Sequence, residues 1–362
     1  MTNDRDTAVR RVLETYVDPY LECDLVTAGA VRALTIDGPT VNLAIELGFP
    51  ASRYAETLAV RLRELIATLD WVTEANVEVV WKVQSHAVQR NLQPIGAIRN
   101  ILAVASGKGG VGKSTTAVNL ALALARDGAR VGLLDADIYG PSQPRMMGLA
   151  GERPVSRGGR SIVPLEAYGV KVISIGFLID EEEPMVWRGP MVTQALTQLI
   201  SETDWGELDY LIVDMPPGTG DIQLTLSQRV PVSGAVIVTT PQDIALIDAR
   251  KGLRMFQKVE VPVLGIVENM STHICSQCGH EEHVFGTGGG RRMAEQYGVA
   301  LLAELPLDVR IREQADGGRP TVVAEPDSPL GQAYMDMSRR IAAKLVRTDA
   351  GTVFPTISVE DS

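Results

Sequence analysis

A glycine-rich segment at residues 106–115, SGKGGVGKST, restricts the fold of this 362-residue chain more than any other feature. It matches the pattern G-x-x-x-x-G-K-[ST], with Gly107, Gly112, Lys113 and Ser114 at the fixed positions. The apolar run ILAVA precedes it and the helical pattern STTAVNLALALARDG follows it. A strand, a glycine-rich turn and a helix in this order let backbone N–H groups approach phosphate oxygens without hindrance from Cβ atoms. The segment therefore predicts a nucleotide-binding loop.

The remainder of the chain beyond residue 100 predicts an α/β fold. Helical patterns alternate with short apolar runs, which are ILAVA, VGLLD, VKVISIG, YLIVD, GAVIVTT, VLGIVEN and ALLAEL. Continuous apolar runs suit strands buried on both faces, so we expect a mostly parallel sheet covered by helices on both faces. A closing helix is predicted from one apolar face, formed by Leu330, Tyr334, Met337, Ile341 and Leu345. Residues 100–347 are assigned to this P-loop NTPase domain and residues 348–362 to a flexible tail.

Residues 1–83 have a different pattern and predict a small α+β domain. A helical opening at residues 8–21 leads to the alternating segments AVRALTIDG and TVNLAIELG, with Gly38-Pro39 at the turn. RYAETLAVRLRELIATL predicts an amphipathic helix, and NVEVVWKV predicts the closing strand. Residues 84–99 are polar and aperiodic, and we interpret them as a linker between the two domains.

Composition and charge argue against several classes of protein. The formal net charge of −11 disfavours a nucleic-acid surface, because phosphate backbones require a basic face. The N-terminal residues do not resemble a signal peptide, and no apolar run approaches the ~18 residues of a transmembrane helix. Three cysteines make a disulfide framework implausible and favour a cytoplasmic location. We expect neither nucleic acid nor membrane among the partners.

Carboxylates at predicted strand ends are candidates for the chemistry of nucleotide hydrolysis. Lys113 is expected to contact the β- and γ-phosphates, and the Ser114 hydroxyl to help hold Mg²⁺. Asp214 ends the run YLIVD and is the expected carboxylate partner of that ion. LLDAD supplies two further acids: Asp137 is the expected water-orienting residue, whereas Asp135 could equally cap the helix that follows.

The loop contains a second lysine, Lys108, which an ordinary phosphate loop does not need. The segment resembles the deviant Walker A loop of the MinD/ParA/nitrogenase-iron-protein ATPases through Gly107, Lys108, Gly109, Gly110, Val111, Gly112, Lys113, Ser114 and Thr115. In that family the extra lysine reaches the phosphates bound by a partner subunit, so the resemblance implies an ATP-dependent homodimer. It also implies that Asn269, in VENM, contacts adenine and that Pro306 lies near the same base.

A C-x-x-C motif, Cys275 and Cys278, follows the run VLGIVEN. Four thiolates suit an iron–sulfur cluster, and a dimer would supply them from two such motifs. A zinc site is the alternative, since His280 and His283 could join the two cysteines, although the second pair follows too closely for ordinary finger geometry. A catalytic dithiol is disfavoured because no thioredoxin-like unit surrounds the motif. We expect the three histidines, His273 included, to be polar loop groups.

The combination of GKGGVGKST, DADIYGPS, DMPPGTGD and ENMS…CxxCGH resembles the Mrp/ApbC family of iron–sulfur cluster carriers over about residues 95–345. The resemblance implies a homodimer that hydrolyses ATP with Mg²⁺ and holds one [4Fe–4S] cluster between the C-x-x-C motifs of its two subunits. Its implied partners are a cluster donor and apo iron–sulfur client proteins. The first domain resembles a small iron–sulfur-assembly domain but lacks the cysteine that many free-standing relatives carry, so we expect it to dock a partner. Cys23 is interpreted as a small apolar residue.

Two other functions could use the same loop. A membrane-positioning ATPase should end in a basic amphipathic helix, whereas this chain ends in FPTISVEDS. An electron-transfer reductase resembling the nitrogenase iron protein uses widely separated single cysteines. The segment GTGGG at residues 286–290 has no lysine and is expected to be a flexible connection beside the cysteines. The sequence therefore favours a cluster carrier.

Overall fold

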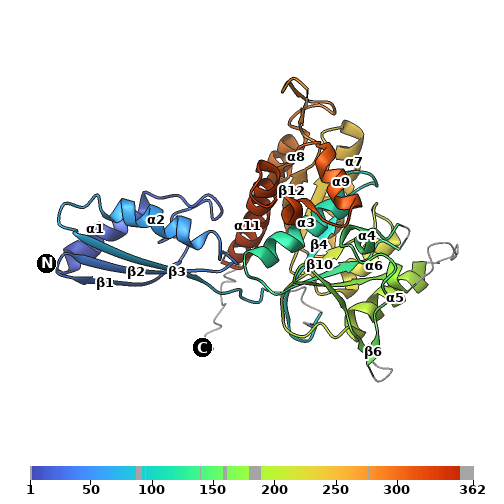
Figure 1. Ribbon diagram of the computed structural model, residues 1–362, viewed down its shortest axis with the longest axis horizontal. Helices are drawn as coiled ribbons and strands as arrows, with labels where there is room; N and C mark the ends of the chain where they lie inside the picture. Colours follow the sequence, from blue (N-terminus) through green and yellow to red (C-terminus); the bar gives the residue numbers. More distant parts are fainter. Residues whose placement is uncertain are drawn as a thin grey trace, which may run out of the picture.

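The computed structural model describes residues 2–86, 92–93, 95–138, 140–157, 161–178, 189–275 and 277–350. Part of the predicted linker, and the predicted tail from residue 351 onward, lie outside these ranges. Figure 1 shows a small N-terminal unit beside a larger α/β unit, with the long helix α11 (Pro329–Ala350) at the junction between them. Within the described residues, no helix combines the length and the apolarity needed to cross a membrane.

The N-terminal unit is a three-stranded sheet covered by two helices. In chain order its elements are α1 (Thr2–Glu14), β1 (Val31–Asp37), β2 (Thr40–Leu47), α2 (Ala55–Ile66) and β3 (Glu74–Trp81). The hairpin β1–β2 is antiparallel, and α2 crosses over so that β3 pairs with β2 in parallel. The apolar face of α2 buries Leu58, Leu62 and Ile66 against the sheet.

The first helix differs from its predicted span of residues 8–21, because it starts at Thr2 and ends at Glu14. Pro19 disfavours helical backbone at Asp18. The Asp18 carboxylate instead accepts hydrogen bonds from the backbone N–H groups of Tyr20 and Leu21, at 2.9 Å each. The chain therefore turns where the apolar spacing alone predicts continued helix.

The larger unit is built on an eight-stranded sheet with the order β15-β12-β11-β4-β10-β5-β9-β8. All neighbouring strands are parallel except β8 and β9. The strands are β4 (Ile98–Ala105), β5 (Val131–Asp135), β8 (Leu165–Ala167), β9 (Val170–Ser174), β10 (Leu208–Asp214), β11 (Gly234–Thr239), β12 (Val263–Glu268) and β15 (Ala300–Glu304). The predicted mostly parallel α/β sheet is confirmed, and each of the seven apolar runs forms one of its strands.

Helices cover both faces of this sheet, as predicted. One buried cluster joins alternate strand residues to α3 (Lys113–Arg126) and α11, and a second joins the other strand residues to α5 (Gly189–Glu202), α6 (Asp221–Arg229), α7 (Asp243–Lys258) and α8 (Gly289–Tyr297). The shorter helices are α4 (Gln143–Met146), α9 (Val309–Asp316) and α10 (Thr321–Ala324). The predicted apolar face of α11 is buried throughout.

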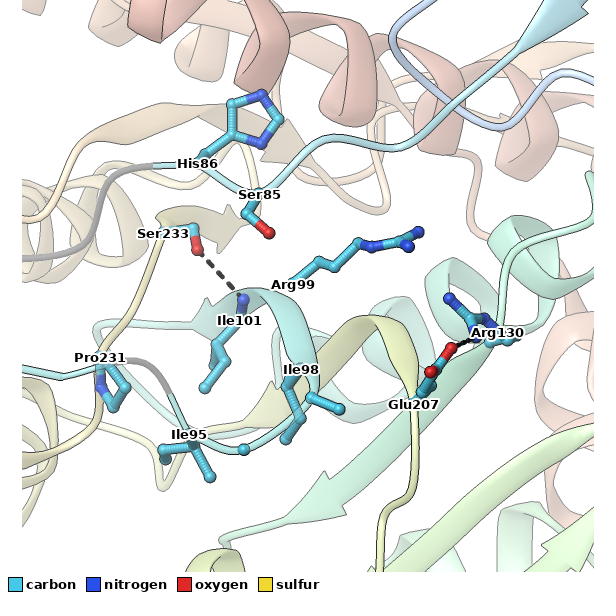
Figure 2. Close-up of a pocket in the computed structure, with 12 residues that line it drawn as sticks. Ser85, His86, Ile95, Ile98, Arg99, Ile101, Arg130, Glu207, Pro231 and Ser233 are labelled. Carbon is cyan, nitrogen blue, oxygen red and sulfur yellow. Dashed lines mark hydrogen bonds and ion pairs between the residues drawn. The ribbon is translucent and has the colours of Figure 1, made fainter.

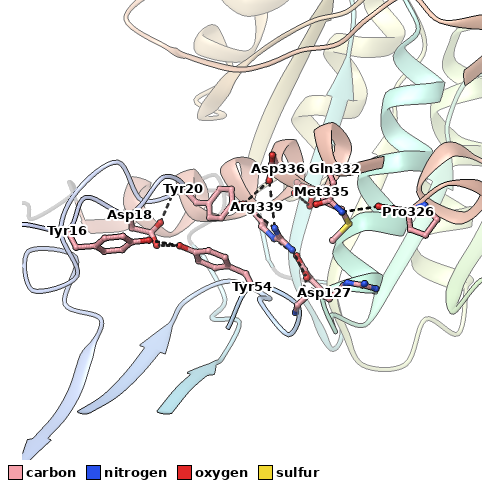
Figure 3. Close-up of polar contacts among 12 residues, drawn as sticks. Tyr16, Asp18, Tyr20, Tyr54, Asp127, Pro326, Gln332, Met335, Asp336 and Arg339 are labelled. Atoms are coloured by element: carbon pink, nitrogen blue, oxygen red, sulfur yellow. Dashed lines mark hydrogen bonds and ion pairs between the residues drawn. The ribbon is translucent and has the colours of Figure 1, made fainter. Parts of the chain in front are cut away.

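Arg339 of α11 joins the two units (Figure 3). Its buried guanidinium binds the Asp127 carboxylate at 2.7 and 3.1 Å. It also lies over the rings of Tyr20 and Tyr54, 5.5 and 5.6 Å from their centroids, within the range of a cation–π contact. The Tyr20 hydroxyl donates to Asp336, one turn earlier on α11, at 2.7 Å. The N-terminal unit is thus fastened to α11 by a buried charge and two aromatic rings.

The same junction reaches the end of α3, the helix that begins at Lys113. The Asp127 carbonyl accepts a hydrogen bond from Ser52 of the N-terminal unit at 3.1 Å. Gly128 has a φ of 100°, and a Cβ atom there would lie 2.7 Å from the Trp81 ring. The N-terminal unit therefore rests on the carboxyl end of the helix whose amino end carries the phosphate-binding motif.

Candidate nucleotide site and cysteine hairpin

The glycines of the phosphate loop are required by backbone conformation and by packing. Gly110 and Gly112 have φ values of 80° and 82°, in the left-handed region that disfavours side chains. A Cβ atom on Gly107 would lie 2.1 Å from the carbonyl carbon of Asp248 in α7, and one on Gly112 would lie 2.1 Å from the amide nitrogen of Asn269. The loop is thus clasped between α7 and the end of β12.

Lys113 lies among carboxylates at the carboxyl edge of the sheet. Its Nζ atom is 2.5 Å from Asp214 and 3.6 Å from Asp137, and 3.2 Å from the Ser114 hydroxyl. Burial lowers the pKa of Lys113, but the neighbouring Asp214 carboxylate outweighs that effect and raises the pKa above its usual value. The structure therefore brings together four residues that the sequence places in one site.

Asp135 has a structural role beside this site. Its buried carboxylate accepts hydrogen bonds from the backbone of Asp137 at 3.1 Å, from the backbone of Gln143 at 3.0 Å, and from the Ser174 hydroxyl at 3.1 Å. Burial, together with the nearby Asp214 carboxylate, raises the pKa of Asp135 to about 7. Gln143 is the first residue of α4, so Asp135 binds a helix start, which was one of its two expected roles.

Gln143 is a site residue that the sequence does not reveal. Its Nε2 atom donates to the Ser114 carbonyl at 3.0 Å and to the Asp214 carboxylate at 2.9 Å. Its Oε1 atom is buried and has no hydrogen-bond partner among the described residues. An unpartnered oxygen beside a hydroxyl and a carboxylate suits a hydrated Mg²⁺ ion, which prefers oxygen ligands. A lone glutamine in a polar loop has no sequence signature that would identify it.

Lys108 and Asn269 border the phosphate loop in different ways. Lys108 is half-buried, and its ammonium forms no ion pair with any residue in the described part of the chain. Asn269 is nearly buried, and its Nδ2 atom donates to the Val111 carbonyl at 2.9 Å. The predicted contacts of Lys108 with a partner's phosphates and of Asn269 with adenine stay predictions.

The C-x-x-C motif forms the tip of a hairpin between β13 (His273–Ile274) and β14 (Glu281–Glu282). The Cys275 N–H donates to the His280 carbonyl at 2.9 Å, and the Gly279 N–H donates to the Cys275 carbonyl at 2.8 Å. Cys275 is half-buried and Cys278 is exposed, and both thiols are free. The backbone N–H groups of Gln277 and Cys278 lower the pKa of Cys275, which favours the thiolate that binds metal.

The four residues of the alternative zinc site do not converge. Within the described residues, which include all four, no group of three or more histidine, cysteine, aspartate or glutamate side chains could hold a metal ion. Two histidine rings are bound to backbone carbonyls instead: His273 to Leu307 and His283 to Ser271, both through Nδ1 at 3.0 Å. The two rings are therefore held by the backbone and not by the cysteines.

The sequence predicts that the segment GTGGG is a flexible connection, and the structure places its last two residues, Gly289 and Gly290, in the first turn of α8. Gly288 has a φ of 65° and precedes the helix. A Cβ atom on Gly289 would lie 2.7 Å from the Pro241 carbonyl oxygen, and one on Gly290 would lie 2.9 Å from the Glu268 side chain. Gly289 and Gly290 are therefore explained by close packing against the ends of β11 and β12, and Gly286 and Gly288 by their positive φ values.

A cavity of about 290 Å³ lies at the opposite end of the sheet, beside the amino end of β4 (Figure 2). Its charged side chains are already paired. Arg99 and Arg130 both bind Asp209, at 2.5 and 3.1 Å, and the His86 ring binds Asn100 at 2.8 Å. Ligands of open parallel sheets bind at the carboxyl ends of strands, where the phosphate loop lies. We therefore assign function to the phosphate-loop edge.

Comparisons with known proteins agree with this arrangement. A ParA-type family model described as NUBPL iron-transfer P-loop NTPase matches residues 97–342, and a model described as iron–sulfur cluster assembly protein matches residues 6–79. The iron–sulfur cluster carrier protein of Pseudomonas fragi is 61% identical over 278 residues, which cover 76% of this chain and 97% of that protein. The protein of the same name from Haemophilus influenzae is 48% identical and covers 98% of this chain and 96% of its own length.

Solved structures show the same fold in the larger unit. A nucleotide-binding protein in complex with ADP from Archaeoglobus fulgidus is 37% identical, with a TM-score of 0.57, and covers 65% of this chain and 91% of its own. The cell division ATPase MinD of Pyrococcus furiosus is 22% identical, with a TM-score of 0.52, and shares the fold. The match covers 67% of this chain and 98% of that protein. This chain therefore belongs to the family of NUBPL iron-transfer P-loop NTPases and carries an iron–sulfur cluster assembly domain in front of the nucleotide-binding domain.

Proposed function

We propose that the protein is an ATP-hydrolysing carrier that holds a [4Fe–4S] cluster as cargo between two subunits and transfers it to apoproteins. One observation carries the proposal: the hairpin that presents Cys275 and Cys278 follows Asn269, whose side chain is bonded to the phosphate loop. The relatives from P. fragi and H. influenzae are named iron–sulfur cluster carrier proteins, which supports the same function.

Nucleotide binding would rearrange the ion pairs around Lys113. Its ammonium is held by Asp214, and phosphate oxygens would compete for the same ammonium. Asp214 would then be free to bind Mg²⁺ together with the Ser114 hydroxyl, and the Gln143 amide oxygen would accept a hydrogen bond nearby. The ion, when bound, neutralises charge that develops on the phosphates. Asp137 would accept a hydrogen bond from the attacking water and so orient it.

A homodimer is proposed for two reasons. Lys108 has no ion-pair partner among the described residues, and in the proposed dimer its ammonium would stabilise phosphate charge bound by the other subunit. A four-iron cluster takes four thiolates, whereas one hairpin offers two. The same free thiols suit a reducing compartment such as the cytoplasm. A cluster donor and apo iron–sulfur clients complete the proposed set of partners.

The proposal is tested by anaerobic reconstitution with iron and sulfide, followed by metal and sulfide analysis of the dimer fraction. We expect about four irons and four sulfides per dimer. The double variant Cys275→Ala/Cys278→Ala should lose both, whereas Cys23→Ala, which removes the thiol of the other domain, should retain them. One zinc per monomer with no cluster held would contradict the carrier function and leave a zinc-binding NTPase.

A further inference from the structure

The hairpin that carries the cysteines is attached at its base by two histidines. His273, on the first arm, binds the Leu307 carbonyl through Nδ1 at 3.0 Å, and the Leu307 N–H donates to the Thr272 carbonyl at 2.7 Å. His283, just beyond the second arm, binds the Ser271 carbonyl through Nδ1 at 3.0 Å. Each arm is therefore tied to backbone outside the cysteine turn.

The direction of these hydrogen bonds fixes the form of both rings. A carbonyl oxygen only accepts, so Nδ1 of each ring must carry the hydrogen. The backbone bonds thus use the ring nitrogen next to Cβ, and the far nitrogen, Nε2, takes no part in them. His280 differs, because its side chain forms no hydrogen bond with any residue in the described ranges. His273 and His283 therefore each have a side-chain hydrogen bond to the backbone that His280 lacks within the described ranges.

One acceptor, the Ser271 carbonyl, lies two residues after Asn269, which is bonded to the phosphate loop, and the other, the Leu307 carbonyl, lies two residues after Leu305, to which Ser271 is bonded. Asn269 donates from Nδ2 to the Val111 carbonyl at 2.9 Å. Met270 follows with a φ of 58°, an uncommon conformation for a residue with a side chain. Ser271 is then fixed by two hydrogen bonds to the Leu305 carbonyl, from its N–H at 2.9 Å and from its hydroxyl at 3.0 Å. The segment from Asn269 to Ser271 is thus a short, bonded connection.

The far end of the cysteine segment returns to the same place. The buried Glu268 carboxylate, the last residue of β12, accepts a hydrogen bond from the N–H of Gly290 in the first turn of α8. The Leu305 N–H in turn donates to the Glu268 carbonyl at 2.8 Å. Both ends of the segment that contains the cysteines are therefore anchored beside the residue that touches the phosphate loop.

We infer that His273 and His283 are positioning residues that transmit movement of the phosphate loop to the cysteine hairpin through their Nδ1 hydrogen bonds. A displacement of Val111 moves Asn269 and with it Ser271, and the hydrogen bonds of Ser271 to Leu305 carry the movement on to Leu307. The bonds of His283 to Ser271 and of His273 to Leu307 then move the hairpin. Nucleotide binding changes the exposure of Cys275 and Cys278 in this way. The inference deepens the proposed function, since it supplies the coupling between nucleotide and cargo.

The test measures how fast the thiols are alkylated by N-ethylmaleimide in the full-length, reduced and metal-free protein. Rates are read for each cysteine by peptide mass spectrometry, with and without Mg²⁺ and a non-hydrolysable ATP analogue. In the native protein the analogue should change the rates at Cys275 and Cys278, while Cys23 serves as an internal control. Loss of a hydrogen bond of ordinary strength corresponds to about fivefold, so a change of that size is expected when the base of the hairpin is released.

Substitutions at His283 separate the roles of its two ring nitrogens. In His283→Asn the amide nitrogen takes the place of Nδ1, so the nucleotide response should be retained. In His283→Gln the amide nitrogen takes the place of Nε2, so the response should be lost, as in His283→Ala. The same pair at His273 should behave alike, and His280→Ala, on the same hairpin, should match the native protein. Affinity for the analogue should be unchanged in all of them.

The inference would be overturned if nucleotide had no effect on the native thiols, or if the response survived in His283→Ala. A response kept by His283→Gln and lost in His283→Asn would overturn it too, because it would assign the function to Nε2. The carrier proposal is judged separately by the reconstitution experiment. If the protein binds no cluster but shows the Nδ1-dependent response, the coupling is supported and the carrier proposal is contradicted. If it binds a cluster but its thiols do not respond to nucleotide, the carrier proposal is supported and the coupling is contradicted.

Discussion

Lys113 and Lys108 stand in the same loop but in opposite electrostatic surroundings. Lys113 is buried against Asp214, so Lys113→Ala leaves a buried carboxylate without its partner. We expect the free energy of unfolding of the nucleotide-free protein to fall by about 3 kcal/mol. Phosphate release from ATP should fall at least about 100-fold, because a group that neutralises phosphate charge is removed.

Lys108→Ala is the matched control for stability. Its ammonium has no ion pair within the described residues, so the free energy of unfolding should change by less than about 0.5 kcal/mol. Phosphate release should nevertheless fall strongly if Lys108 acts across a dimer interface. Urea unfolding and a phosphate assay on both variants check the contrast. An equal loss of stability in the two variants would contradict the contrast between a buried, paired Lys113 and a Lys108 without an ion pair.

Asp135 gives the protein a pH dependence with a definite sign. Its pKa is raised to about 7 in the folded protein, whereas an aspartate in the unfolded chain titrates near its ordinary value. Its contribution to stability is therefore complete below about pH 4 and is lost as the pH rises through 7. Asp135→Asn removes this titration, so its free energy of unfolding relative to the native protein should rise by about 2 kcal/mol between pH 5 and pH 8. Urea unfolding of both proteins at several pH values tests this prediction. If the two curves of unfolding free energy against pH were parallel, the prediction would be wrong.

Residues of the nucleotide site that belong to a recognisable sequence motif could be placed in the site from the sequence. Residues of the site that belong to no motif could not. Lys113, Ser114 and Asp214 occupy fixed places after strands, and the parallel sheet gathers such strand ends at one edge. Gln143 reaches the same site from the start of α4, whose backbone is held by the buried Asp135 carboxylate. The bond from Asn269 to the loop likewise depends on a backbone approach that only the folded chain reveals.

Among the elements, the contact between the phosphate loop and α7 offers a direct test of packing. Gly107→Ala would bring a Cβ atom to 2.1 Å from the α7 backbone, which cannot move as a side chain would. We expect a loss of about 3 kcal/mol in the free energy of unfolding and a matching loss of nucleotide affinity. Gly109→Ala meets no atom within 4 Å and should leave stability unchanged. Thermal unfolding and nucleotide titration distinguish the two, and equal destabilisation would show that α7 does not restrict the loop.

Seven strands of the larger sheet were predictable as elements because each is a continuous apolar run, whereas β8, the element ends and the connections were not. The early end of α1 depends on the turn at Asp18 and Pro19. The spacing of apolar residues does not predict this turn. Gly289 and Gly290, in the first turn of α8, suggest flexibility when the sequence is viewed alone. Their function becomes apparent only when Pro241 and Glu268, distant in sequence, are seen to leave no room for a side chain.

At the scale of the whole molecule, Arg339 contacts the Tyr20 and Tyr54 rings of the N-terminal unit, and its buried ion pair with Asp127 at the end of α3 holds it in place within the larger unit. Arg339→Met would leave Asp127 buried without its charge partner, and we expect a loss of about 3–5 kcal/mol in the free energy of unfolding. One hydrophobic cluster extends from Val9 to Leu345, so the native protein should unfold in a single calorimetric transition. The variant should show two transitions.

Arg340→Met is the control for this variant, because Arg340 lies on the same helix and, among the residues that the structure describes, donates only to the Leu302 carbonyl, at 3.3 Å. It should keep the single transition. Two transitions already present in the native protein would show that the junction does not couple the units. The junction itself could not be predicted, since Tyr20, Tyr54 and Arg339 belong to separate elements and no periodicity links them.

The hydrogen bond between Tyr20 and Asp336 joins residues 316 positions apart, and this separation matters while the chain is being synthesised. At ordinary elongation rates the N-terminal unit leaves the ribosome about 15–60 s before α11 exists. During that interval the rings of Tyr20 and Tyr54 face solvent or a chaperone, since the guanidinium that lies over them is not yet made. Assembly of the α11 side of the junction is therefore a late event in biogenesis, and a chain cut short before α11 would keep only the contacts of the first domain with the end of α3.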